Sequence, residues 1–166
     1  MNVIETRIVG SDSWHDFDTV MQEAAKQSKS CQNCYCFKHR VEEVPEDSKS
    51  KMRALIRSGK AQGLLSYKEH KVTGWVAFEK VEDLPGLEVD LDARNLLIHC
   101  YQVVDPEESK EVLRILLQGV ARRAAYLEYD QLYLHVKDGD ESLLAVAKKL
   151  GYREEKGQEI LVCALS

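Results

Sequence analysis

Three cysteines and a histidine lie within one short stretch of the chain, and all four side chains are soft metal ligands. They are Cys31, Cys34, Cys36 and His39. Zinc is bound tetrahedrally by such thiolate and imidazole donors, so a structural zinc site is one interpretation. Buried thiols are the other, because a free cysteine packs like a small apolar residue. The spacing is tighter than in zinc sites built on two hairpins, which favours thiols without a metal.

A histidine and a tyrosine lie two residues apart in the most strand-like segment, residues 95–104 (NLLIHCYQVV). Side chains two apart in a strand share a face, so we expect His99 and Tyr101 to lie side by side. A histidine titrates near neutral pH and can take a proton from a reacting group. His99 and Tyr101 are therefore candidate catalytic residues. The alternative is that both only fill a half-buried strand.

An acidic stretch precedes that strand and offers a second kind of chemistry. It contains Glu79, Glu82, Asp83, Glu88, Asp90 and Asp92. Such a run can attract a cationic ligand, but it is more often a solvated loop.

Composition limits the class of protein. The chain has 166 residues, which fits one domain over 1–166, and 44% hydrophobic residues, which is enough for a sizeable core. Its net charge of −5 argues against nucleic acid as a general partner. No apolar run approaches the roughly 20 residues of a membrane span. The N-terminus lacks the features of a signal peptide and the five cysteines are an odd number, so we expect reduced thiols and a cytoplasmic protein.

The elements that must position these residues follow from the spacing of apolar side chains. Alternating or continuous apolar runs predict strands over 2–9, 63–67, 72–78, 95–104, 131–136 and 159–165. Helical spacing predicts helices over 14–25, 47–58, 113–124 and 141–150. This order implies an α/β (α+β) fold with a mixed, mostly antiparallel central sheet and helices on both faces.

Four stretches in that order carry a family resemblance. They are Cys34-Tyr35-Cys36 followed by Arg40, residues 63–67 (GLLSY) followed by 74–76 (GWV), residues 98–104 (IHCYQVV) and residues 150–152 (LGY). Taken together, the chain resembles the GNAT N-acetyltransferases over nearly its whole length. The first stretch is similar to the Cys-x-Cys signature of one bacterial branch.

The resemblance implies acetyl-CoA as co-substrate, bound where the fourth and fifth strands splay apart. Its pantetheine would pair with the backbone of Tyr101, Gln102, Val103 and Val104. Its pyrophosphate would lie on the first N–H groups of the next helix, at Ser109, Lys110, Glu111 and Val112. Free amides and the helix dipole favour an anion there. The acceptor pocket would be lined by Cys34, Tyr35, Cys36 and Trp75.

The start of that helix departs from the family pattern. The family loop is Gln/Arg-x-x-Gly-x-Gly/Ala, whereas residues 108–113 (ESKEVL) contain no glycine to let backbone approach phosphate. Asp105, Pro106 and Glu108 predict a self-capped helix whose carboxylates repel a pyrophosphate, with Lys110 as the local compensating charge. In the last helix, Ala147 stands where many members carry a tyrosine general acid.

These observations predict an N-acetyltransferase that moves an acetyl group from acetyl-CoA to a primary amine of a small molecule or peptide. His99 or Tyr101 would accept the proton of the attacking amine. Two alternatives stay open: a catalytically inactive GNAT-like binding or regulatory module, and a zinc-dependent interaction module built on the cysteines. An exposed edge strand near the C-terminus would allow a homodimer.

Overall fold

The computed structural model describes residues 3–27, 35–37, 39–41, 43–137, 140–157 and 159–165. Its strands form one seven-stranded sheet in the order β1-β2-β3-β4-β5-β7-β6. They are β1 (Ile4–Ile8), β2 (Gly63–Lys68), β3 (Lys71–Lys80), β4 (Leu96–Val103), β5 (Gln131–His135), β6 (Arg153–Lys156) and β7 (Ile160–Ala164). Neighbouring strands are antiparallel except β4 and β5, which are parallel. The predicted mixed, mostly antiparallel sheet is confirmed.

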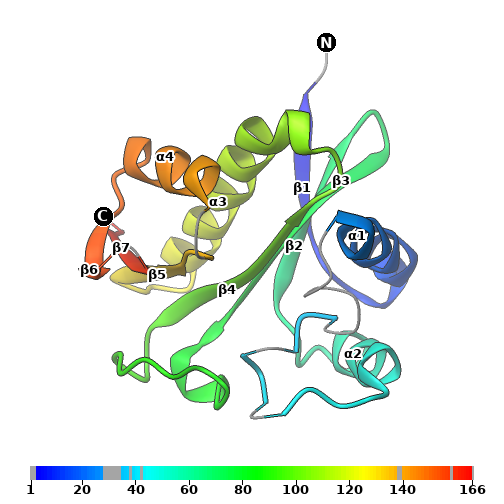
Figure 1. Ribbon diagram of the computed structural model, residues 1–166, viewed down its shortest axis with the longest axis horizontal. Helices are drawn as coiled ribbons and strands as arrows, with labels where there is room; N and C mark the ends of the chain where they lie inside the picture. Colours follow the sequence, from blue (N-terminus) through cyan, green and yellow to red (C-terminus); the bar gives the residue numbers. More distant parts are fainter. Residues whose placement is uncertain are drawn as a thin grey trace.

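Helices cover both faces of this sheet, as predicted. They are α1 (Trp14–Gln27), α2 (Ser48–Arg57), α3 (Ser109–Tyr126) and α4 (Glu141–Lys149), with short 3-10 turns at Ser11–Ser13, Val81–Asp83 and Pro106–Glu108. Figure 1 shows α1 and α2 on one side of the sheet and α3 and α4 on the other. Phe17, Met52 and Trp75 are fully buried in the α1/α2 core, while Leu116 and Leu143 are fully buried in the α3/α4 core.

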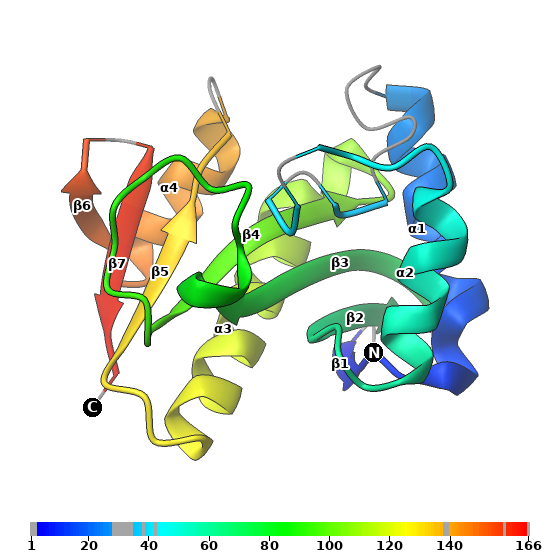
Figure 2. The ribbon, with the colours of Figure 1, turned by 90° about the horizontal axis from the view of Figure 1, so that it is seen from below.

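A third, smaller core lies beneath the loop that joins β3 to β4. Leu84 of this loop is buried with Leu97, Tyr133 and Ile160 of the adjoining strands. In Figure 2 the loop lies against β5 and β7. The acidic stretch of the sequence is therefore part solvated loop and part anchor, because apolar residues between the carboxylates fix it to the sheet.

Strand β6 is the one described strand that the sequence analysis missed. Its four residues, REEK, are all exposed, so no apolar alternation marks them. Pairing with β7 makes this segment a strand. The edge strand expected near the C-terminus is thus β6, and not the segment 159–165, which is β7.

Gly74 lets helix α3 approach the sheet beside the end of β4. A Cβ atom at Gly74 would lie 2.7 Å from Cγ1 of Val112 and 3.1 Å from the backbone oxygen of Gln102. Val112 is completely buried in the α3/α4 core. The packing of Val112 over Gly74 therefore sets where the first turn of α3 lies relative to β4.

We expect Gly74→Ala to destabilise the protein by about 1–3 kcal/mol, because the added methyl overpacks this contact. Removing the clashing methyls with Val112→Ala in the same chain should recover part of the loss, so the double variant loses about 1 kcal/mol less than the sum of the single variants. Urea denaturation of the wild type and the three variants measures this coupling. Strict additivity would contradict the packing argument.

Candidate active site

The parallel strands β4 and β5 pair over a short length and then separate. Pairing runs from Leu96 with Leu132 to Ile98 with Leu134, while β4 continues to Val103. A cleft of about 170 Å³ lies beside the second half of β4. Its lining residues are Gln27, Tyr101, Gln102, Val103, Pro106, Ser109, Leu113, Lys137 and Asp140.

A β-bulge in β4 accounts for this separation. Ala77 of β3 pairs with Cys100 and Phe78 pairs with Ile98, so His99 is an extra residue without a partner in the register. A bulge bends its strand and increases the local twist. The second half of β4 is thereby turned away from β5 at the point where their pairing ends.

The bulge also overturns the expectation that His99 and Tyr101 share a face. Tyr101 belongs to the α3/α4 core and lines the cleft. His99 is 3% exposed, and its ring lies edge-on to that of His39, with centroids 6.1 Å apart, while His39 in turn contacts the ring of His135 at 4.6 Å. The extra residue breaks the two-residue alternation on which the expectation rested. Of the two candidate catalytic residues, the cleft therefore contains only Tyr101.

The hydroxyl of Tyr101 joins the two sides of the cleft. It donates to Oδ2 of Asp140 at 2.8 Å and accepts from the backbone N–H of Lys137 at 3.3 Å. Burial, together with the adjacent Asp140 carboxylate, raises the pKa of Tyr101 far above its ordinary value. Tyr101 is therefore a neutral phenol that can hold or pass on a proton, but does not form a stable phenolate.

Asp140 and Lys137 are the charged side chains among those that line the cleft. Asp140 also caps helix α4, because its Oδ1 accepts from the N–H of Leu143 at 3.0 Å. The Lys137 ammonium lies 4.8 Å from the Tyr101 ring centroid and 3.4 Å from the Tyr101 carbonyl oxygen. Both residues follow β5, and sequence reasoning assigned neither to the site, since only the separation of the strands brings them to β4.

Backbone groups of β4 are divided between the sheet and the cleft. The N–H of Val104 donates to Thr73 of β3 at 2.9 Å, whereas the carbonyl of Tyr101 points to Lys137. Because strand N–H and C=O groups alternate in direction, Val103 directs its own toward the cleft. The carbonyl of Val104 accepts from Gln27 Nε2 at 2.8 Å, so α1 closes that end.

The 3-10 turn that leads into α3 is capped by the side chain of Asp105, whereas no described side chain caps α3 itself. Asp105 Oδ1 accepts from the N–H of Glu107 at 3.0 Å, and the N–H of Ser109 donates to Pro106. Ser109 lines the cleft. The other helix residues predicted to bind the cofactor, Lys110, Glu111 and Val112, are not among the lining residues, nor is Val104. The side chain of Val112 packs in the core over Gly74, so its predicted role concerns its backbone N–H alone and stays a prediction.

The described residues among those predicted to line an acceptor pocket lie on the other face of the sheet. Trp75 is completely buried, with its ring edge-on to Phe17 at 4.8 Å, and Cys36 is 2% exposed. Tyr35 is half-buried and donates to Asp18 Oδ1 at 2.7 Å. Cys34, like Cys31 of the zinc hypothesis, lies outside the described residues. A role of this group in acceptor binding stays a prediction.

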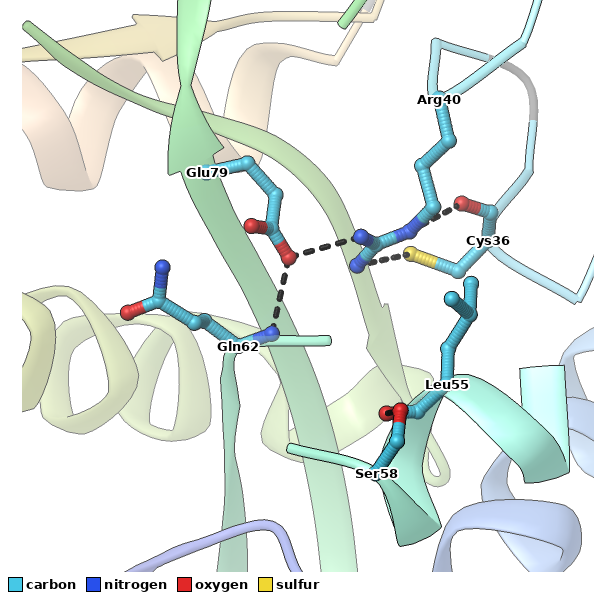
Figure 3. Close-up of polar contacts among 6 residues, drawn as sticks. All are labelled: Cys36, Arg40, Leu55, Ser58, Gln62 and Glu79. Carbon is cyan, nitrogen blue, oxygen red and sulfur yellow. Dashed lines mark hydrogen bonds and ion pairs between the residues drawn. The ribbon is translucent and has the colours of Figure 1, made fainter. Parts of the chain in front are cut away.

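A buried ion pair fixes the segment that contains Cys36. Arg40 Nη1 lies 2.7 Å from Glu79 Oε1, and the two side chains are 7% and 4% exposed. Glu79 also accepts from the backbone N–H of Gln62 at 2.8 Å. Figure 3 shows the Arg40 guanidinium between the Glu79 carboxylate and the Cys36 sulfur, near the end of α2 where Ser58 bonds Leu55. Glu79 thus lies within β3, one residue before its end, and is not part of a solvated acidic loop.

The fold is that of the GNAT acetyltransferase superfamily. Solved structures of this class superpose over nearly the whole chain, at sequence identities of 11–13% for the three described below. No protein-family model matches the sequence, and no curated protein matches it. The structural similarity therefore establishes the fold, while the site must be argued from its own residues.

Three of these structures illustrate the similarity. The PaiA N-acetyltransferase of Thermoplasma acidophilum, in complex with coenzyme A, is 11% identical and has a TM-score of 0.66, covering 98% of this chain and 99% of that one. A phosphinothricin acetyltransferase of Sinorhizobium meliloti with acetyl-CoA is 13% identical, with a TM-score of 0.66 and coverage of 98% and 89%. A GNAT family acetyltransferase of Brucella melitensis with acetyl-CoA is 12% identical, with a TM-score of 0.60 and coverage of 100% and 90%.

Two properties of the described residues bear on membranes and metal ions as partners. Within the part of the chain that the structure describes, no helix is both long and apolar enough to cross a membrane. Over the same residues, no group of three or more His, Cys, Asp and Glu side chains is placed to bind a metal ion.

We expect Glu79→Gln to destabilise the protein by about 3–5 kcal/mol, because it leaves the buried Arg40 charge without its counter-ion. Glu82→Gln is the matched control: its contact with Lys80 is 3.9 Å long and solvent-exposed, so about 0.5 kcal/mol or less is expected. Chemical denaturation of both variants checks this. Equal small losses would show that the Arg40–Glu79 pair is dispensable.

Stability should fall in mild acid because of His99. Burial, with Arg40 and the neighbouring histidines, lowers the pKa of His99 well below its ordinary value. The unfolded chain therefore binds the proton more readily than the folded protein. The contribution of neutral His99 to the free energy of unfolding is fully present above about pH 6.5. It is lost as the pH falls, by up to about 1.4 kcal/mol per pH unit. His99→Gln should flatten this dependence in urea titrations, whereas His15→Gln, on the exposed face of α1, should not. An unchanged slope in His99→Gln would refute the assignment.

Proposed function

We propose that this chain binds acetyl-CoA between β4 and β5 and transfers the acetyl group to a primary amine of a small molecule or peptide. The observation that carries the proposal is the separation of β4 from β5 beyond Ile98, with a cleft lined by the β4 backbone. The GNAT fold supports it, since structures with the same fold contain acetyl-CoA or coenzyme A.

The backbone of Val103 would pair with the pantetheine arm, which is an amide chain and needs such partners. A backbone N–H of Tyr101 to Val103 would polarise the thioester carbonyl as the amine attacks. Lys137 would stabilise the negative charge on the departing sulfur, since its ammonium group is the cation that lines the cleft. The contribution of this lysine was not expected from the sequence.

Tyr101 is the better of the two catalytic candidates because it lines the cleft, whereas His99 is buried beneath the opposite face. The amine proton would pass to the Tyr101 oxygen while the phenol proton moves to Asp140, 2.8 Å away. No phenolate forms in this concerted transfer, which agrees with the raised pKa of Tyr101.

The start of α3 favours a second candidate, a GNAT-like binding or regulatory module without catalysis. The Asp105 carboxylate and the Gln27 amide already satisfy backbone groups beside the cleft, at Glu107 and Val104. Carboxylates in the first turn also disfavour a pyrophosphate. The two candidates differ in whether acetyl-CoA binds.

Calorimetric titration should show binding of acetyl-CoA with a Kd on the order of 1 μM, that is about −8 kcal/mol. Lys137→Glu should weaken binding more than about tenfold, because it replaces the cation of the cleft with a carboxylate that repels the negatively charged acetyl-CoA. The same change at Lys110, which is exposed and outside the lining set, tests the sequence-based assignment of the pyrophosphate. No heat at millimolar acetyl-CoA would reject the transferase and leave the binding module.

With an accepted amine, found by screening polyamines, aminoglycosides and peptide α-amines for release of free CoA thiol, Tyr101→Phe should lower the rate about 100-fold or more. Its affinity for acetyl-CoA should be unchanged, since the ring remains. Tyr133→Phe is the matched control, because Tyr133 is buried in the small core beneath the β3–β4 loop. Equal rates in the wild type and Tyr101→Phe would exclude the proton transfer through Tyr101.

A further inference from the structure

Two cysteines distant in sequence meet on the face of the sheet opposite the cleft. Cys36 lies in a short segment, and Cys100 lies on β4 directly after the bulge. Their side chains pack in the same core cluster, and the Cys100 thiol lies close enough to Cys36 to lower its pKa. Both belong to the α1/α2 core, where Cys36 is 2% exposed and Cys100 is partly exposed. The proton transfer proposed above uses neither thiol.

The buried guanidinium of Arg40 lies beside the sulfur of Cys36. Arg40 Nη2 is 3.9 Å from Cys36 Sγ, and Arg40 Nε donates to the Cys36 carbonyl at 3.1 Å (Figure 3). Glu79 holds the guanidinium in place from the other side, at 2.7 Å. The charge is therefore buried, fixed and aimed at Cys36, which is the environment that favours a thiolate.

The backbone supports the view that this segment is held in a definite conformation. Tyr35 and Cys36 both have positive φ angles, 44° and 70°. Such angles are costly for residues other than glycine and persist where surrounding contacts enforce them. The contacts of Arg40 and Cys100 with Cys36 supply that constraint.

We propose that Cys36 and Cys100 form a redox-active pair that closes to a disulfide when the protein meets hydrogen peroxide. The Cys36 thiolate attacks one peroxide oxygen and, with one proton taken up, gives Cys36 sulfenic acid and water. The Cys100 sulfur then displaces that hydroxyl as a second water, and its own proton leaves with it. The two sulfurs are oxidised by two electrons and the peroxide is reduced to water.

The division of roles follows from the surroundings of each sulfur. The sulfur of Cys36 lies beside the positive charge of Arg40, whereas Cys100 is partly exposed to solvent. Burial raises the pKa of Cys36, but the Cys100 thiol and the charge of Arg40 outweigh it and lower the pKa to about 7. Because Cys36 is almost completely buried, the oxidant must be nearly as small as water.

The test treats the reduced wild-type protein with hydrogen peroxide and maps disulfides by mass spectrometry after alkylation and proteolysis. We expect a loss of two hydrogen atoms and one cross-linked peptide pair that joins Cys36 to Cys100. Cys163→Ser is the matched control, because Cys163 is a partly exposed cysteine on β7. This control should oxidise like the wild type.

Cys100→Ser should block the cross-link and leave Cys36 as a sulfenic acid, which dimedone traps when the oxidised protein is unfolded in its presence. The rate of Cys36 oxidation should rise about tenfold between about pH 6 and 8, whereas an ordinary thiol of pKa near 9 would gain about ninetyfold. A disulfide from Cys36 to Cys31 or Cys34, or no oxidation of Cys36 while Cys163 reacts, would overturn the proposal. These readouts need no acetyl-CoA, so they are independent of the proposed acetyl transfer.

Discussion

One extra residue in β4 controls the arrangement of this protein's chemistry. Because His99 is a bulge opposite β3, the strand changes direction where its parallel pairing with β5 ends. The separation creates the cleft and brings the chain after β5, with Lys137 and Asp140, opposite Tyr101. The same bulge turns His99 and Cys100 to the other face. A regular strand would have placed His99 and Tyr101 together and left the two strands paired.

The opposite face depends on a different interaction, the buried pair of Arg40 and Glu79. A salt bridge removed from water contributes little by itself, because desolvation offsets the attraction. Its effect here is positional: the guanidinium, held by Glu79 of β3, contacts both the carbonyl oxygen and the sulfur of Cys36 and so fixes that segment. A core of aromatic and aliphatic side chains alone would not specify which residue of that segment faces Cys100.

The region between these two faces combines features that favour and disfavour a CoA thioester. The strands offer backbone partners for an amide chain, and Lys137 supplies a positive charge within the cleft. Carboxylates lie both in the 3-10 turn before α3 and in the first turn of α3, and Asp105 caps the 3-10 turn, where an anion would otherwise lie. A protein with this arrangement would hold the pantetheine and thioester more firmly than the pyrophosphate. A glycine-rich phosphate loop, by contrast, would hold the pyrophosphate through free backbone N–H groups.

The sequence by itself determined the element order, the sheet type and the capped turn before α3, because these follow from local apolar periodicity and from side chains within one turn. The apolar stripe from Leu113 to Ala124 and the cap at Asp105 are both local in this sense. It missed β6, which has no apolar residue and exists through pairing with β7. Tertiary structure decided the bulge at His99, the roles of Lys137 and Asp140, and the contact of Cys36 with Cys100. Each depends on register or on contacts between distant segments, and side-chain alternation along a single strand contains no information about either.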